Sequence, residues 1–155
     1  MPAAPDGVAE VLQASLRLHW SQAEMYDAQS VHFTRWGYPK LGETWAGYAA
    51  EERGHIKALS ERLEFYDIQP EVDHEFLSWP RHDFEGILTS NYDADVEAAA
   101  AERAGFLLCT EVGDPNSAHI FRKLRKGSEE SMANIEAIRL VIEQIGIDNY
   151  LANQV

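Results

Sequence analysis

Glycine and proline interrupt this chain of 155 residues in few places, and the stretches between the interruptions are long. Such stretches predict helices over about residues 6–36, 42–67, 83–112 and 114–146. Gly37 with Pro39 marks the first stop, and Gly113 with Pro115 marks the break before the fourth helix. The tail, residues 147–155, predicts one or two further helical turns. The chain is therefore expected to be all-α.

The connection between the second and third expected helices is long and contains Pro70 and Pro80. Its residues, about 68–81, reach roughly 45 Å at about 3.3 Å per residue. A helix of about 27 residues is roughly 40 Å long, so this connection is able to cross a whole bundle. The other connections are short and make antiparallel neighbours. We therefore expect two helical hairpins joined by one long crossover, which is the connectivity of ferritin-like four-helix bundles.

The charge balance limits the partners of the chain. Thirteen Lys and Arg residues against 26 Asp and Glu residues give a formal charge of −13, which repels nucleic acid and anionic membranes. The single cysteine, Cys109, excludes an internal disulfide and a cysteine metal cage. We find neither a secretory leader nor a long apolar run. The expectation is one cytoplasmic domain over 1–155, with residues 1–7 disordered and no membrane or nucleic-acid partner.

Polar residues interrupt the apolar stripe of each expected helix at about mid-height. The interruptions are His19 in the first helix, Glu52 and His55 in the second, Asp95 in the third, and Ser128 and Ser131 in the fourth. The stripe expected on the third helix consists of Leu88, Tyr92, Asp95, Val96, Ala99, Phe106 and Cys109. Buried polar groups need partners, so these interruptions predict a functional or structural centre.

Two interpretations of this polar level are open. His19, Glu52 and His55 offer two imidazoles and a carboxylate, the ligand set of open non-haem iron sites, and Asp95 adds a further oxygen. The same set would also take zinc. The alternative is a metal-free network of buried hydrogen bonds among the same residues.

At these residues the sequence resembles a bacterioferritin, a member of the ferritin-like superfamily, from about Val11 to Gln154. The residues that carry the resemblance are Trp36-Gly37, Lys40-Leu41, Glu52-Arg53-Gly54-His55, Gly146 and Asn149-Tyr150-Leu151. The resemblance implies a four-helix subunit with a short fifth helix, assembled into a 24-subunit shell. It further implies that the shell oxidises Fe(II) and stores the ferric mineral inside.

The chain departs from the family at the dinuclear iron centre. Glu52 and His55 match family ligands, but His19 stands where the first helix has a Glu, and Asp95 is a shortened third-helix Glu. Serines replace the Glu and His of the fourth helix. A single metal on the remaining residues is one expectation. The resemblance also makes Tyr26 a candidate electron donor, with a core aromatic residue as the alternative.

The family's haem site is altered as well. The resemblance places a haem-ligating methionine directly after the second-helix Glu, where this chain has Arg53. A guanidinium stays protonated and does not ligate iron, so haem is not expected. Met25 and Met132 lie elsewhere on their helices.

Three functional hypotheses follow. The first is an iron-handling shell subunit, homo-oligomeric or mixed with a second ferritin-like subunit, with an altered metal centre. The second is a non-catalytic subunit whose centre has decayed. The third is a mononuclear oxygen-using enzyme that acts on a small organic substrate, although nothing in the sequence identifies a substrate pocket for it.

A basic run and four histidines are the remaining notable features of the sequence. Arg122, Lys123, Arg125 and Lys126 form a basic run on the fourth helix, which we interpret as a solvated face or subunit contact rather than a binding patch. The four histidines without a partner at ligand spacing are expected at the surface. These are His32, His74, His82 and His119.

Overall fold

The fold was examined in a computed structural model that describes residues 2–155. Met1, part of the segment 1–7 that we expected to be disordered, lies outside the described residues. The helices are α1 (Val8–Trp36), α2 (Pro39–Phe65), α3 (Phe84–Glu111), α4 (Pro115–Ile145) and α5 (Ile147–Ala152). Residues 2–155 contain no strand, and the all-α prediction is confirmed.

Local sequence sets the helix ends. α2 begins at Pro39, three residues before the expected start at Gly42, because the fixed φ of proline suits the first helical turn. Asp83 caps α3 by accepting a hydrogen bond from the Gly86 backbone N–H, and Asp114 caps α4 in the same way. Gly37 ends α1 with φ 105°, a conformation that residues with a Cβ rarely adopt.

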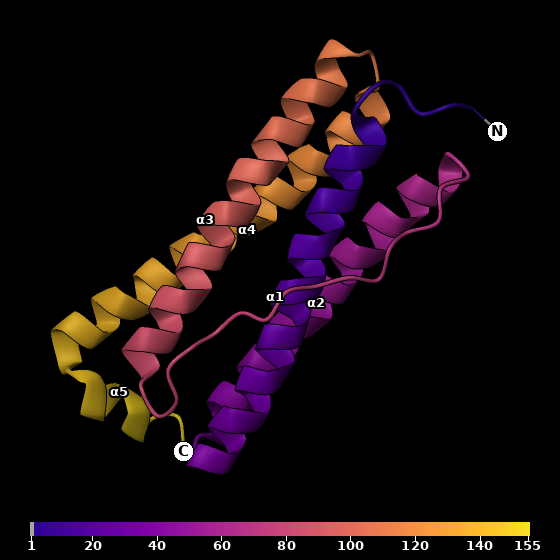
Figure 1. The fold of residues 1–155 in the computed structure, drawn as a ribbon. Helices are drawn as coiled ribbons and strands as arrows, with labels where there is room; N and C mark the ends of the chain where they lie inside the picture. Colours follow the sequence, from indigo (N-terminus) through magenta and orange to yellow (C-terminus); the bar gives the residue numbers. More distant parts are fainter. Residues whose placement is uncertain (1) are drawn as a thin grey trace.

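The helices form two antiparallel hairpins, α1 with α2 and α3 with α4 (Figure 1). A crossover formed by residues 66–83 runs along α1 from one end of the bundle to the other, so α2 and α3 point the same way (Figure 1). The expected ferritin-like connectivity is therefore confirmed. The chain end returns to the start of α2, where the Lys40 backbone N–H donates to the Gln154 carbonyl oxygen at 3.3 Å.

The end of the crossover is anchored on α1 by His32. The prediction that His32 lies at the surface is wrong, since its side chain is 6% exposed. Its Nε2 accepts a hydrogen bond from the His82 backbone N–H at 3.1 Å, and its ring lies among the rings of Trp36, Trp79 and His82. The neutral His32 imidazole thus accepts a hydrogen bond that attaches the end of the crossover to α1.

The buried core consists of two apolar clusters. One lies at the end that holds the start of α1 and includes Leu12, Leu16, Leu59, Leu63 and Phe121. The other lies at the opposite end and includes Phe33, Trp45, Phe84, Leu88 and Ile135. The polar residues that interrupt the helical stripes lie between the two clusters, so they separate the core into halves.

The stripe expected on α3 is confirmed at Leu88, Asp95 and Cys109, which are buried, but it is wrong at other positions. Val96 is 47% exposed, whereas Asn91 and Glu102 are buried. The actual stripe follows alternating steps of three and four residues and consists of Leu88, Asn91, Asp95, Ala98, Glu102, Gly105 and Cys109.

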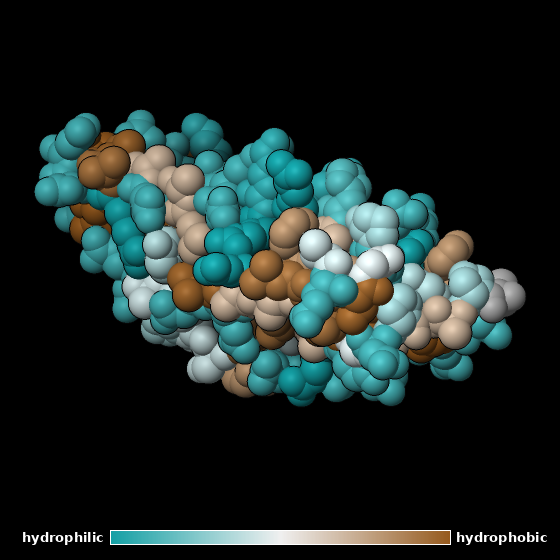
Figure 2. Space-filling view, turned by 90° about the horizontal axis from the view of Figure 1, so that it is seen from above, coloured by the Kyte–Doolittle hydropathy of each residue, from teal (hydrophilic) through white to brown (hydrophobic). Residues whose placement is uncertain are grey.

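The surface is mostly hydrophilic, with separate hydrophobic patches along the molecule (Figure 2). Its exposed apolar side chains include Val96, Leu107 and Leu140. In the described part of the chain, no helix has the length and apolar character needed to cross a membrane.

Gly105 gives a test of the packing between α3 and α4. A Cβ at this position would lie 2.6 Å from Cε1 of the buried Phe121 ring. We expect Gly105→Ala to lower the free energy of unfolding by about 1 kcal/mol, because overpacking outweighs the better helix propensity of alanine. The control Gly47→Ala, where a Cβ meets nothing within 4 Å, should raise it by about 0.5 kcal/mol in the same urea titration.

Candidate functional site

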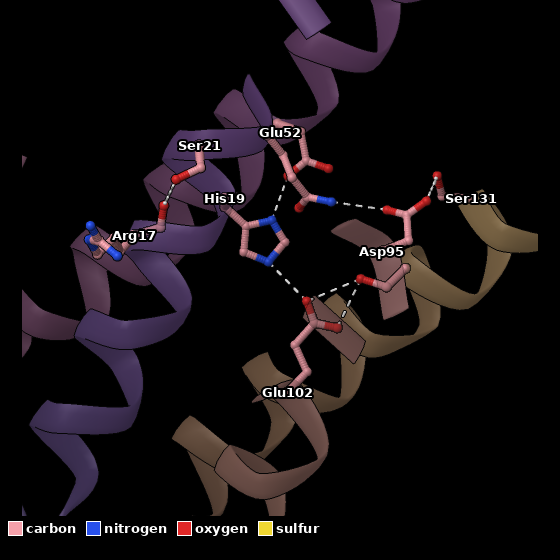
Figure 3. A network of polar contacts seen from close by, with 9 residues as sticks. Arg17, His19, Ser21, Glu52, Asp95, Glu102 and Ser131 are labelled. Carbon is pink, nitrogen blue, oxygen red and sulfur yellow. Dashed lines mark hydrogen bonds and ion pairs between the residues drawn. The ribbon is translucent and has the colours of Figure 1, made fainter. Parts of the chain in front are cut away.

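His19 lies at the centre of the polar level and is held at both ring nitrogens. Its Nδ1 lies 2.5 Å from Glu52 Oε2, and its Nε2 lies 2.9 Å from Glu102 Oε1 (Figure 3). The His19 side chain is 1% exposed, Glu102 is fully buried and Glu52 is 12% exposed. With a carboxylate at each nitrogen, the imidazole donates two hydrogen bonds and carries a positive charge.

The fourth helix joins this network through Ser128. Its Oγ lies 3.1 and 3.0 Å from the two carboxylate oxygens of Glu102 and donates to this carboxylate. Each of the four long helices therefore contributes one member, namely His19, Glu52, Glu102 and Ser128. We call these four residues the central network.

The two carboxylates control the charge of His19. Burial by itself disfavours the imidazolium, but the hydrogen bonds to Glu102 and Glu52 outweigh it and raise the pKa of His19 to about 9. The fully buried Glu102 is thus compensated by a cation, as a buried carboxylate requires.

A second tier lies beside the central network. Asp95 accepts a hydrogen bond from Gln22 Nε2 at 3.0 Å and one from Ser131 Oγ at 2.6 Å (Figure 3). Burial raises the pKa of Asp95 to about 7, with a further contribution from the charge of Glu52. This tier again links α1, α3 and α4 through hydrogen bonds.

A cavity of about 380 Å³ opens between α2 and α4 at the level of both tiers. Its wall includes Glu52, His55 and Asp95, with Tyr26 and Tyr48 beside them. The His55 ring meets the His19 ring edge to face, with 5.2 Å between centroids. Burial lowers the pKa of His55 despite the nearby Glu52 charge, so this imidazole is the neutral one of the pair.

The structure brings the four expected metal ligands to one level, but it engages three of them, His19, Glu52 and Asp95, in hydrogen bonds and leaves His55 in the cavity wall. His19 has no free nitrogen lone pair, and the hydroxyl groups of Ser128 and Ser131 donate to Glu102 and Asp95. Within residues 2–155, no group of three or more His, Cys, Asp or Glu side chains is arranged to hold a metal ion. This donor set does not fit a pair of iron ions.

Of the network expected as the alternative, the hydrogen bond between His19 and Glu52 is present, whereas Asp95 bonds to Gln22 and Ser131 instead. Metal binding stays a prediction. A role of Tyr26 as an electron donor stays a prediction as well. Burial raises the pKa of the Tyr26 hydroxyl well above its usual value, and the negative charges of Asp95 and Glu52 raise this pKa further.

Sequence reasoning missed Glu102, although it completes the central network. The signal was its distance of seven residues from Asp95, which places both on one face of a helix that follows a heptad. Gln22 was missed for a related reason. It lies three residues after His19 on the buried face of α1, but glutamine is not typical of metal sites.

The haem-related position also has a defined structure. The Arg53 guanidinium lies 2.9 Å from Glu24 Oε1 and 2.7 Å from Asp27 Oδ2, and it covers the ring of Trp20. Arg53 is therefore fixed on the outer face of the α1–α2 hairpin by two carboxylates of α1.

Glu102→Gln tests the central network by removing one of its two negative charges. We expect the free energy of unfolding to fall by about 3 kcal/mol, because the buried His19 imidazolium then loses its fully buried counter-charge and keeps only the partly exposed Glu52. The matched control is Glu97→Gln on the exposed side of α3, which should change it by less than about 0.5 kcal/mol. If Glu102→Gln and Glu97→Gln unfolded at the same urea concentration, the ion pair between His19 and Glu102 would not stabilise the fold.

The pH dependence of stability follows from the raised pKa of His19. The pKa of an unperturbed histidine is 6.5, so the folded state holds an extra proton between this pH and about 9. The free energy of unfolding should fall by up to about 3 kcal/mol as the pH rises through this range. Asp95 adds a fall in the same direction between pH 3.8 and about 7. Urea titrations of His19→Gln at a series of pH values should show no fall in stability between pH 6.5 and about 9, but should still show the fall that Asp95 causes at lower pH.

Comparison with known proteins agrees with the fold. Residues 9–145 match the model of the ferritin-like domain. The chain is 25% identical over 144 residues to a bacterial ferritin of Synechocystis, with 92% of each chain covered. It is 24% identical over 152 residues to a bacterioferritin of Mycobacterium leprae, and 22% identical over 149 residues to that of Mycobacterium avium. These two matches cover 96% and 94% of this chain, and 92% and 91% of the relatives. With its two hairpins, long crossover and matching residues, this chain belongs to the ferritin-like family.

Proposed function

We propose that this chain is a subunit of a bacterioferritin-like iron-storage assembly and contributes to the protein shell rather than to iron oxidation. One observation carries the proposal, namely the engagement of both ring nitrogens of His19 by Glu52 and Glu102. A histidine held in this way has no lone pair for a metal ion.

The charge balance of the centre supports this function. Carboxylates buried in a helical bundle need positive charge nearby. In this chain the His19 imidazolium supplies it to Glu52 and Glu102, while Ser128 donates to Glu102 and Ser131 donates to Asp95. The chain's own side chains thus offset one of the two negative charges of the central network without a metal ion.

A non-oxidising subunit needs a source of ferric iron. We propose that it assembles with a second ferritin-like subunit that carries a complete centre, so that mineral forms in a mixed shell. The shared family and the coverage of more than nine-tenths of the bacterioferritin relatives support this arrangement.

A second candidate function rests on the cavity between α2 and α4. Its wall presents Glu51, Glu52, Asp95 and Glu130 together with the imidazole of His55. Carboxylates and a neutral imidazole suit a single divalent cation such as Fe(II) or Zn(II). In this function the subunit takes up one ion as cargo without a paired iron centre.

The test is aerobic loading of the purified chain with Fe(II), followed by light scattering and by counting the iron in each size fraction. The shell function predicts a large assembly in which iron oxidises no faster than in protein-free buffer. Co-expression with a complete bacterioferritin should give mixed particles that fill with iron. Fast oxidation by this chain alone would contradict the proposal.

Zinc titration calorimetry separates the second candidate. One bound ion per chain, lost in both Glu52→Gln and His55→Ala, would support the cation site and contradict the purely structural function. The control is Glu61→Gln, an exposed change elsewhere on α2 that should leave zinc binding unchanged.

A further inference from the structure

Four basic side chains form one stripe on the first half of α4. His119, Arg122, Lys123 and Lys126 follow the spacing i, i+3, i+4 and i+7, which places them on one face of the helix. All four are exposed. We call them the basic stripe.

The basic stripe lacks internal counter-charges. Among the residues that the structure describes, no carboxylate pairs with any of its four side chains. The adjacent Arg125 does pair, with Glu129 at 2.9 Å, and Arg53 is held by two carboxylates. Like charges three and four residues apart destabilise a helix, and acidic residues are twice as numerous as basic ones in this chain. Other exposed cations, among them Arg35, Arg81 and Arg103, also have no carboxylate partner anywhere in residues 2–155. The stripe differs from them because its basic side chains share one helix face, where an external anion can meet several of them at once.

The surface beside the stripe is hollowed. Two hollows of about 520 and 490 Å³ share Phe106, His119 and Arg122, so they form one groove along the stripe. Phe106 and Thr110 supply the α3 side of this groove. The groove runs from the turn between α3 and α4, whose place Figure 1 shows, along α4 as far as Glu129, whose carboxylate pairs with Arg125.

We propose that this groove binds a compact anion with several linked phosphates. Guanidinium groups form paired hydrogen bonds with phosphate oxygens, and lysines act as mobile point charges. The stripe extends about 10 Å along the helix axis, which exceeds the reach of one phosphate and suits a short phosphate chain. Several simultaneous contacts are also needed to overcome the net charge of −13.

The same chemistry occurs in inorganic polyphosphate and in nucleoside polyphosphates. The ring of Phe106 offers an apolar wall on which the base of a nucleotide would lie. This site shares no residue with the central network, so it does not depend on the proposed function.

The experiment measures binding of sodium tripolyphosphate to the intact protein by titration calorimetry at low ionic strength. The test variant is Arg122→Gln with Lys126→Gln, and the matched control is Arg35→Gln with Arg81→Gln. Both pairs change two exposed cations, so each lowers the net charge equally. We expect the dissociation constant to rise by about tenfold or more in the test variant and by less than about twofold in the control.

Further measurements distinguish a nucleotide from an inorganic polyphosphate as the ligand. If ATP binds more tightly than tripolyphosphate, and Phe106→Ala removes only this difference, the ligand is a nucleotide. Equal binding of both supports a polyphosphate chain alone. Absence of binding to the unchanged protein, or an equal loss in the control, would overturn the proposal. It would also be overturned if the test variant changed the assembly size in light scattering, since the stripe would then be a contact between copies.

Discussion

One protonated imidazole between the fully buried carboxylate of Glu102 and the partly exposed one of Glu52 determines how the four long helices fit together. His19 on α1 must meet Glu52 on α2 and Glu102 on α3, and Ser128 on α4 satisfies the second carboxylate. A buried ion pair gains little stability over apolar packing, but a mismatch leaves a charge without a partner. The network therefore acts chiefly on specificity, because only one register of the helices satisfies all of its groups.

The apolar clusters and the polar level between them contribute differently to the structure. The two apolar clusters lie at either end of the bundle and supply most of the buried hydrophobic surface. The polar level between them contributes few apolar contacts and fixes the relative height of the helices. Small residues on its α4 side, Gly127 and Ser131, leave room for the cavity that opens toward α2. The centre is thus rigid where α1 meets α3 and hollow where α2 faces α4.

Much of the fold could be predicted from the sequence, because glycine, proline and the crossover length report directly on helix ends and connectivity. The buried face of α1 was also predictable, including His19. The face of α3 was predictable only in part, since residues 98–101 are four consecutive alanines that carry no information on helical phase. Glu102 directly follows this run and was missed, so one of the two partners that fix the protonation of His19 remained hidden. Site chemistry here depends on contacts across helices, which a single helical pattern does not contain.

The crossover also has a kinetic consequence. Each hairpin closes over a short turn, whereas contacts between α1 and α3 span the whole of α2 and residues 66–83. Local contacts form faster than distant ones, so the hairpins are expected to precede their docking. Within the first hairpin, His19 meets Glu52 while water still reaches both; Glu102 arrives only with the second. Expulsion of water from the charged centre is therefore expected in the last stage of folding, when the second hairpin brings Glu102 against His19.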